Sequence, residues 1–159
     1  MKKITNVIKV SLQLASQSSE IPALSAMRTW VNAALQARVD KAEMGIRVVD
    51  EAESALLNQT YRHKTGATNV LSFPFEMPLK RAVRLLGDLV ICAPIVKREA
   101  SLQGKSLEAH WAHLVVHGAL HLVGFDHEKA DEAAIMEALE VEVLQRLDFP
   151  NPYQEGLND

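Results

Sequence analysis

Three of the chain's six histidines fall within eleven residues, in the segment HGALHLVGFDH at 117–127. His117 and His121 are four residues apart, so a helix would present both on one face. Gly124 can adopt a positive φ, end that helix and return His127 towards the pair. Three neutral imidazoles with a fourth position left to water form a catalytic zinc arrangement. We therefore predict that His117, His121 and His127 bind one Zn²⁺ per chain.

Two further histidines, His110 and His113, fall on the same face of this helix. A helix rises about 1.5 Å per residue, so His113 and His121 start roughly 12 Å apart, too far to converge on one ion with bonds to nitrogen of about 2 Å. His113 can pair with His117 instead, but only the pair at 117 and 121 is followed by a chain reversal and another histidine. We expect His110 and His113 to support or pack against the site, and His63 to lie at the surface.

Gly118 separates this motif from a known class of zinc protease. The spacing matches the metzincin pattern H-E-x-x-H-x-x-G-x-x-H at every named position except one, where Gly118 replaces the glutamate that acts as general base. The substitution leaves metal binding unaffected but disfavours peptide hydrolysis. A metalloprotease-like hydrolase is therefore the third alternative for the function.

Composition and charge narrow the class of protein. The single cysteine, Cys92, cannot form an internal disulfide, which favours the reducing cytoplasm, and no apolar run is long enough to cross a membrane. The length predicts one domain over 1–159 and gives no indication of the oligomeric state.

The distribution of charge along the chain is uneven. Residues 1–105 hold 15 Lys/Arg and 9 Asp/Glu, a net charge of +6, whereas residues 106–159 hold 2 and 11, a net charge of −9. The first part can therefore present a basic surface to RNA, or its charges can simply be solvated. The candidates for RNA contact are Lys80, Arg81, Arg84, Lys97, Arg98 and Lys105.

Alternating hydrophobic periods predict an α/β (α+β) fold, with a single layer of about four strands covered by helices. The metal site then lies on a central helix and the turn after it. We expect strands at 4–14, 44–50, 68–75 and 84–93. We expect helices at 22–36, 51–62, 94–103 and 106–123, and a last amphipathic helix carrying Met136, Leu139, Val143 and Leu147.

Local signals mark the ends of these elements. Pro22 and Pro94 suit the first turns of their helices. Gly104 ends the helix that Pro94 opens, and Gly124 ends the helix that follows it. Ser106 is a candidate N-cap, Asp50 and Glu53 form a candidate capping box, and a turn is expected around Pro78.

Three segments, in this order, resemble the YbeY family of bacterial endoribonucleases that act in ribosomal RNA maturation. They are YRHKTGATNVLSF at 61–73, LGDLVIC at 86–92 and HLVVHGALHLVGFDH at 113–127. The resemblance implies a zinc-dependent, single-strand-specific endoribonuclease of the cytoplasm. It implies a role in small-subunit rRNA 3′-end processing and ribosome quality control, with single-stranded RNA, rRNA and the small ribosomal subunit as partners. It also implies that His117, His121 and His127 are the metal ligands and that Arg62 is the functional arginine.

These residues suit phosphodiester cleavage. Zinc on three histidines can lower the pKa of a bound water to about 7, so no carboxylate base is required, and the RNA 2′-hydroxyl is an alternative nucleophile. We predict His117 and Arg62 as catalytic residues, with the planar fork of Arg62 gripping a phosphate rather than forming a surface ion pair. Asp88 is expected to be structural, and Asp126 to orient a histidine or cap the last helix.

The rival from another class is a non-catalytic ribosome-associated module with a structural metal. Such a site is usually closed by a fourth protein ligand, often cysteine. Cys92 is far from the histidines in sequence, and its apolar strand predicts burial. We therefore favour an open, catalytic site.

Overall fold

A computed structural model describes residues 7–75 and 83–153 of the chain. These residues include a four-stranded sheet in the order β1-β2-β4-β3. Its strands are β1 (Ile8–Ala15), β2 (Ala42–Val49), β3 (Val70–Pro74) and β4 (Arg84–Cys92). β1, β2 and β4 run parallel, and β3 pairs antiparallel with β4 along one edge. The mixed α/β fold with about four strands is therefore as predicted.

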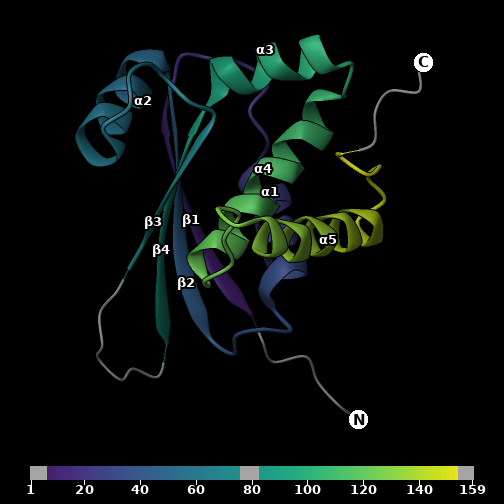
Figure 1. Ribbon diagram of the computed structural model, residues 1–159. Coiled ribbons are helices and arrows are strands. Elements are labelled where there is room, and N and C mark those ends of the chain that lie inside the picture. The colour runs from purple at the N-terminus through teal and green to yellow at the C-terminus, as the bar shows by residue number, and fades with distance from the viewer. Residues whose placement is uncertain (1–6, 76–82, 154–159) are drawn as a thin grey trace.

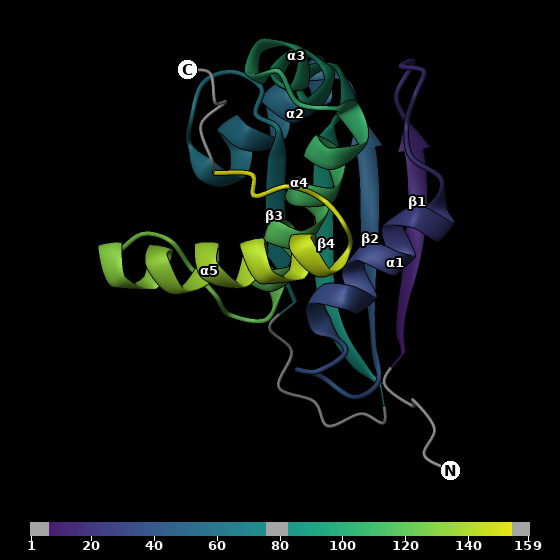
Figure 2. The ribbon, with the colours of Figure 1, turned by 90° about the vertical axis from the view of Figure 1, so that its right-hand side faces the viewer.

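The helices lie unevenly about this sheet. They are α1 (Leu24–Leu35), α2 (Glu51–Leu57), α3 (Ala93–Gln103), α4 (Leu107–Leu122) and α5 (Ala130–Arg146), and a π-helical segment, η1 (Asn58–Arg62), directly continues α2. Figure 1 shows α1, α4 and α5 on one side of the sheet and α2 on the other. Figure 2, turned by 90°, shows α5 crossing in front of α4. Among the described residues, no helix is both long and apolar enough to span a membrane.

Two apolar clusters hold these layers together. The larger fills the space between the sheet and α1, α4 and α5, and includes the fully buried Trp111, Leu89 and Met136. The smaller lies on the opposite face and contains Cys92 and Val90. Ten of the 16 residues of α4 are buried, as expected for a helix packed between the sheet and other helices. The histidine motif is therefore carried by the most enclosed helix of the fold.

Several predicted element ends are confirmed. Pro94 lies in the first turn of α3, and Gly104, at φ 68°, ends that helix. The Ser106 hydroxyl accepts a hydrogen bond from the backbone N–H of Ala109, as an N-cap does. In α5, Met136 and Val143 are buried.

One predicted helix start and one predicted capping box are wrong. Pro22 precedes α1 rather than lying in its first turn, because Ala23 is still extended, at ψ 157°. Asp50 holds the N-cap position of α2 but makes no capping hydrogen bond with its side chain. Its carboxylate instead accepts from Ser16 and from the backbone of Gln17, beyond the end of β1.

Glu53, the other half of the predicted capping box, has an alternative partner. It forms a two-point ion pair with Arg47 of β2, with distances of 2.7 and 2.9 Å between the paired nitrogens and oxygens. Tertiary contacts of both acids thus replace the local capping contacts. The turn expected around Pro78 lies outside the described residues.

Candidate metal centre

The end of α4 turns the chain back on itself through hydrogen bonds between backbone groups. The N–H of Phe125 donates to the carbonyl of Leu120 over 3.1 Å, and that of Gly124 donates to the carbonyl of His121 over 3.0 Å. This pattern is a Schellman motif, which needs a residue of positive φ, and Gly124 has φ 108°. Phe125 packs on the apolar core that contains Leu120, which anchors the turn. The reversal leads directly to His127.

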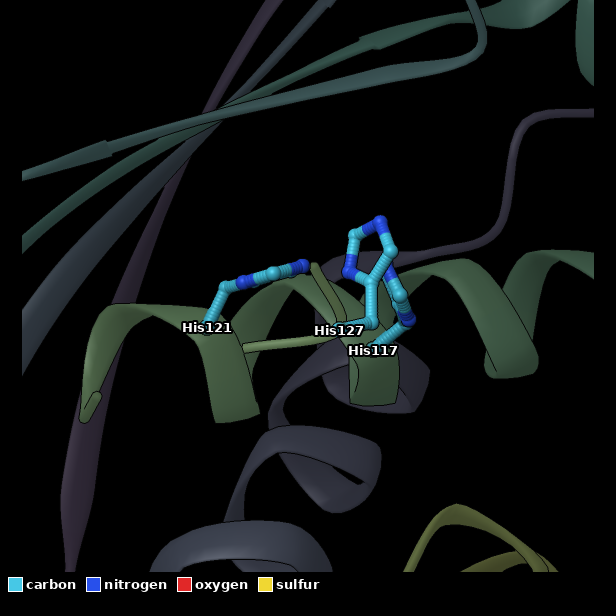
Figure 3. Close-up of side chains that lie close together, drawn as sticks. All are labelled: His117, His121 and His127. Atoms are coloured by element: carbon cyan, nitrogen blue, oxygen red, sulfur yellow. The ribbon is translucent and has the colours of Figure 1, made fainter. Parts of the chain in front are cut away.

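His117, His121 and His127 come together as a result (Figure 3). Their ring centroids are 4.7 Å apart for His117 and His121, 4.8 Å for His121 and His127, and 5.3 Å for His117 and His127. One nitrogen from each ring lies within 4.8 Å of the others. An all-imidazole set at this spacing suits a borderline-soft divalent cation. The three residues therefore fit a metal ion.

A carboxylate that the sequence analysis missed lies behind this cluster. Glu140 of α5 is fully buried, and its Oε2 accepts a hydrogen bond from Nδ1 of His117 over 2.6 Å. Its Oε1 accepts from Nε2 of His113 over 2.8 Å and from the hydroxyl of Tyr153. His113, His117 and Glu140 also lie close enough together to form a second group of metal ligands. Their hydrogen bonds already account for this proximity.

The two remaining histidines of α4 each form a hydrogen bond with a carboxylate. His113 contacts Glu140, whereas His110 is buried and pairs through Nε2 with Oε1 of Glu99 over 2.8 Å. Glu99 also accepts from the side chain of Asn69. His63 is exposed, as expected.

Burial and charge set the protonation of the site. Burial lowers the pKa of His121, and the neighbouring His117 and His127 lower it further, so its ring favours the neutral form that a metal requires. Burial raises the pKa of Glu140, but hydrogen bonds from His113 and His117 outweigh this effect and hold it at about 2. Glu140 is thus an anion at neutral pH.

Gly118 faces the sheet, not the metal cluster. A Cβ added at this position would lie 2.7 and 2.8 Å from the two Cδ atoms of Leu89 on β4. Leu89 is fully buried, so it has little room to move aside. The position that carries the catalytic glutamate in metzincins is therefore occupied here by close packing between α4 and β4. This arrangement removes the metzincin base from the site.

Arg62 reaches the same region from another element. It is the last residue of η1, after which His63 adopts left-handed backbone angles. Its guanidinium donates to the backbone carbonyls of Tyr61 and Ser72 and lies over the ring of Phe73, 5.1 Å from the centroid. A hydrogen bond from the side-chain amide of the buried Asn58 to the carbonyl of Gly66 ties down the loop that follows.

A cleft of about 620 Å³ joins these groups. Arg62 and the three clustered histidines all line it, together with β3 residues such as Ser72. Lys64 lines it too and was not singled out from the sequence, although it lies only two residues after Arg62. The sequence-predicted arginine and histidines thus share one cavity.

Only one of the two predicted aspartates lines this cleft. Asp88 lines a different pocket, together with Arg47 and Glu53 of β2 and α2. Asp126 lines the cleft, but its carboxylate accepts from the backbone N–H of His127, and Lys129 holds the N-cap position of α5. The expectation that Asp126 caps the last helix is therefore wrong, because a nearer donor takes its carboxylate.

The predicted basic surface is divided among separate contacts. Lys97 pairs with Glu20 over 3.1 Å, and Arg98 pairs with Glu51. The Lys105 ammonium donates to the carbonyl of Pro152 over 3.0 Å. Arg84 is exposed at the start of β4, and Lys80 and Arg81 lie outside the described residues.

Comparison with known proteins matches this arrangement to a family. The family model described as endoribonuclease YbeY matches residues 11–148. The chain belongs to the YbeY endoribonuclease family. The endoribonuclease YbeY of Pseudomonas putida (strain W619) is 54% identical over 154 residues, covering 96% of this chain and 98% of that protein. The endoribonuclease YbeY of Methylococcus capsulatus is 56% identical over 149 residues, covering 94% and 97%.

A solved structure supports the fold independently. The solution structure of TM1509 from Thermotoga maritima has a TM-score of 0.57 and 21% sequence identity, and the match covers 91% of this chain and 99% of that one. The predicted resemblance to the YbeY family is therefore confirmed, and with it the expectation of an enzyme in the endoribonuclease class. Nothing in these YbeY relatives favours a non-catalytic module or a metalloprotease.

Proposed function

We propose that this chain is a metal-dependent endoribonuclease that hydrolyses phosphodiester bonds in single-stranded RNA. Its substrate is ribosomal RNA, and it acts on the small ribosomal subunit in the cytoplasm, in 3′-end maturation and quality control. The observation that carries the proposal is the cleft of about 620 Å³ that Arg62 shares with His117, His121 and His127. The name shared by the relatives supports RNA as the substrate.

His117, His121 and His127 would hold one Zn²⁺. When bound, Zn²⁺ supplies a Lewis acid and lowers the pKa of a water to about 7. Cys92 is buried in the apolar cluster on the opposite face of the sheet, so it is no candidate for a closing fourth ligand. This placement supports an open, catalytic site over a structural one.

Arg62 would grip the phosphate of the bond to be cleaved. A guanidinium has five N–H donors, and in the described part of the chain its hydrogen bonds go to the two carbonyl groups of Tyr61 and Ser72. Donors therefore remain for two phosphate oxygens, and the fixed fork matches their geometry. The contact with Ser72 holds the guanidinium at the edge of the cleft.

The decisive experiment removes the fork and keeps the charge. We expect Arg62→Lys to lower single-turnover cleavage of single-stranded RNA by about 10²-fold, on the scale of a lost oxyanion donor. Zinc content and melting temperature should stay near wild type, because no arginine nitrogen ligates the metal. Arg47→Lys is the matched control, because it makes the same exchange at a guanidinium that pairs with Glu53 outside the cleft. Full cleavage by a stable, zinc-loaded Arg62→Lys protein would refute the phosphate clamp.

The metal ligands can be tested without any activity assay. We expect about one zinc per chain in the wild type and a marked loss in His121→Ala, measured by elemental analysis of purified protein. His63→Asn is the control, because His63 is exposed and asparagine tolerates its left-handed backbone angles. Equal zinc in wild type and His121→Ala would remove His121 from the site.

A further inference from the structure

A fully buried carboxylate among three hydrogen-bond donors is the feature that the metal site leaves unexplained. Glu140 has no exposed surface, and its two oxygens contact Nδ1 of His117, Nε2 of His113 and the hydroxyl of Tyr153. Burying an ionised carboxylate costs free energy unless its oxygens accept hydrogen bonds from neighbouring donors. Three donors on two oxygens meet that condition. The group is therefore built as an acceptor.

The contact with His117 determines which of its ring nitrogens carries the proton. An ionised carboxylate can only accept, so Nδ1 of His117 must be the N–H that donates across 2.6 Å. In a neutral ring the proton then resides on Nδ1, and Nε2 keeps its lone pair. A metal ligand needs that lone pair, and a carboxylate on the far nitrogen fixes both tautomer and ring orientation.

The other contacts of Glu140 hold the carboxylate itself in place. Nε2 of His113 lies 2.8 Å from Oε1 and 3.2 Å from the Tyr153 hydroxyl, so these two side chains bracket one oxygen. Tyr153 comes from the segment after α5, which is tied down where Lys105 donates to the carbonyl of Pro152. Side chains from α4 and from the segment after α5 thus converge on one carboxylate of α5.

We propose that Glu140 is the positioning residue of the metal centre, fixing His117 with its Nε2 lone pair available to the ion, with His113 and Tyr153 locking the carboxylate. The proposal rests on the proposed function only in taking His117 as a metal ligand. It gives His113 the role of securing Glu140, and it assigns a role to Tyr153.

Glu140→Gln tests the proposal, since it keeps the shape of the side chain and replaces one oxygen with an NH₂ donor. The amide oxygen should face the two donors, His113 and Tyr153, and the NH₂ should face His117. Nδ1 of His117 must then accept, which moves its proton to Nε2 and removes the lone pair from the metal side. Zinc affinity, measured by competition with a chelating dye, should fall about 10–100-fold.

Two further proteins complete the test. Glu99→Gln makes the same exchange beside His110, one turn from His113 on the same helix, and should leave zinc affinity and the His117 tautomer unchanged. Tyr153→Phe removes one donor but keeps the carboxylate, so His117 should stay protonated on Nδ1 and zinc affinity should fall less than in Glu140→Gln.

The tautomer is read directly from two-bond ¹H–¹⁵N spectra of metal-free protein. Wild type should show Nδ1–H on His117 and Nε2–H on His113, a result that needs no variant to fold and no RNA cleavage. The opposite tautomer on His117 in wild type would overturn the proposal, as would a Glu140→Gln protein with wild-type zinc affinity. Absence of zinc binding by wild type with the expected tautomers would instead count against the proposed function.

Discussion

The packing of Gly118 against Leu89 predicts that the effect of Gly118→Ala on the free energy of unfolding changes sign with the size of the side chain at position 89. In Gly118→Ala, the new Cβ would lie 2.7 and 2.8 Å from the Cδ atoms of Leu89, whereas carbon atoms in good contact are about 3.5–4.0 Å apart. Overpacking of this kind costs about 1–3 kcal/mol, and alanine in place of glycine within a helix recovers about 1 kcal/mol. We expect a net loss of about 1 kcal/mol in the free energy of unfolding.

The same substitution should stabilise the protein once Leu89 is shortened. Leu89→Ala alone should cost about 2–5 kcal/mol, because it leaves a cavity at a fully buried site. Adding Gly118→Ala to that background places a methyl group in the cavity and keeps the helix-propensity gain of about 1 kcal/mol. The two substitutions should therefore couple by about 2 kcal/mol, within the range seen for residues in contact.

Urea unfolding of all four proteins measures this cycle. The experiment is run with a chelator present, so that bound metal does not contribute to stability. Unchanged m-values would show that the midpoints report the native state rather than a changed denatured state. If Gly118→Ala has the same effect in both backgrounds, the contact with Leu89 is not the reason for glycine at this position, and the close packing of α4 on β4 must be explained otherwise.

Two further predictions concern the start of α4 and the cleft. Ser106→Ala should lower the free energy of unfolding by about 1 kcal/mol, because the hydrogen bond from the backbone N–H of Ala109 is lost. In thermal unfolding, the melting temperature should fall by about 2–4 °C. An unchanged melting temperature would mean that the N-cap contributes nothing to stability. Lys64→Ala should weaken single-stranded RNA binding and reduce its salt slope by about 1, because Lys64 lines the cleft. Lys97→Ala is the control, since Lys97 pairs with Glu20, and equal effects of the two would assign them to general charge.

The parts of the site that were predictable from sequence are local in the chain. His117, His121 and Gly124 lie within eight residues, and helix geometry with one positive φ is enough to bring His127 back to them. Spacing also excluded a ligand set that contains both His113 and His121. A short segment with strong backbone rules therefore carried most of the prediction.

The parts that were not predictable depend on contacts between distant segments. Asp50 and Glu53 match a capping box, but Ser16, Gln17 and Arg47 supply partners that no local rule includes. Glu140 is 23 residues from His117, and only the crossing of α5 over α4 brings them together. One signal was available in the sequence. Glu140 lies on the buried stripe of α5 between Met136 and Val143, where an acidic residue needs a partner.

The position of Gly118 links packing to chemistry. Because α4 approaches β4 closely enough to exclude a side chain at 118, the histidines on either side of it share a cleft with β3 and Arg62. A glutamate at 118 would have to displace the fully buried Leu89 before it could approach the metal site. The helix therefore presents candidate metal ligands without a carboxylate base. Its nearest buried carboxylate, Glu140, is committed to three hydrogen bonds behind His117. An arginine at the cleft and a carboxylate kept behind His117 suit phosphodiester cleavage, because a cation stabilises the negative charge of the phosphate and a further anion would repel it.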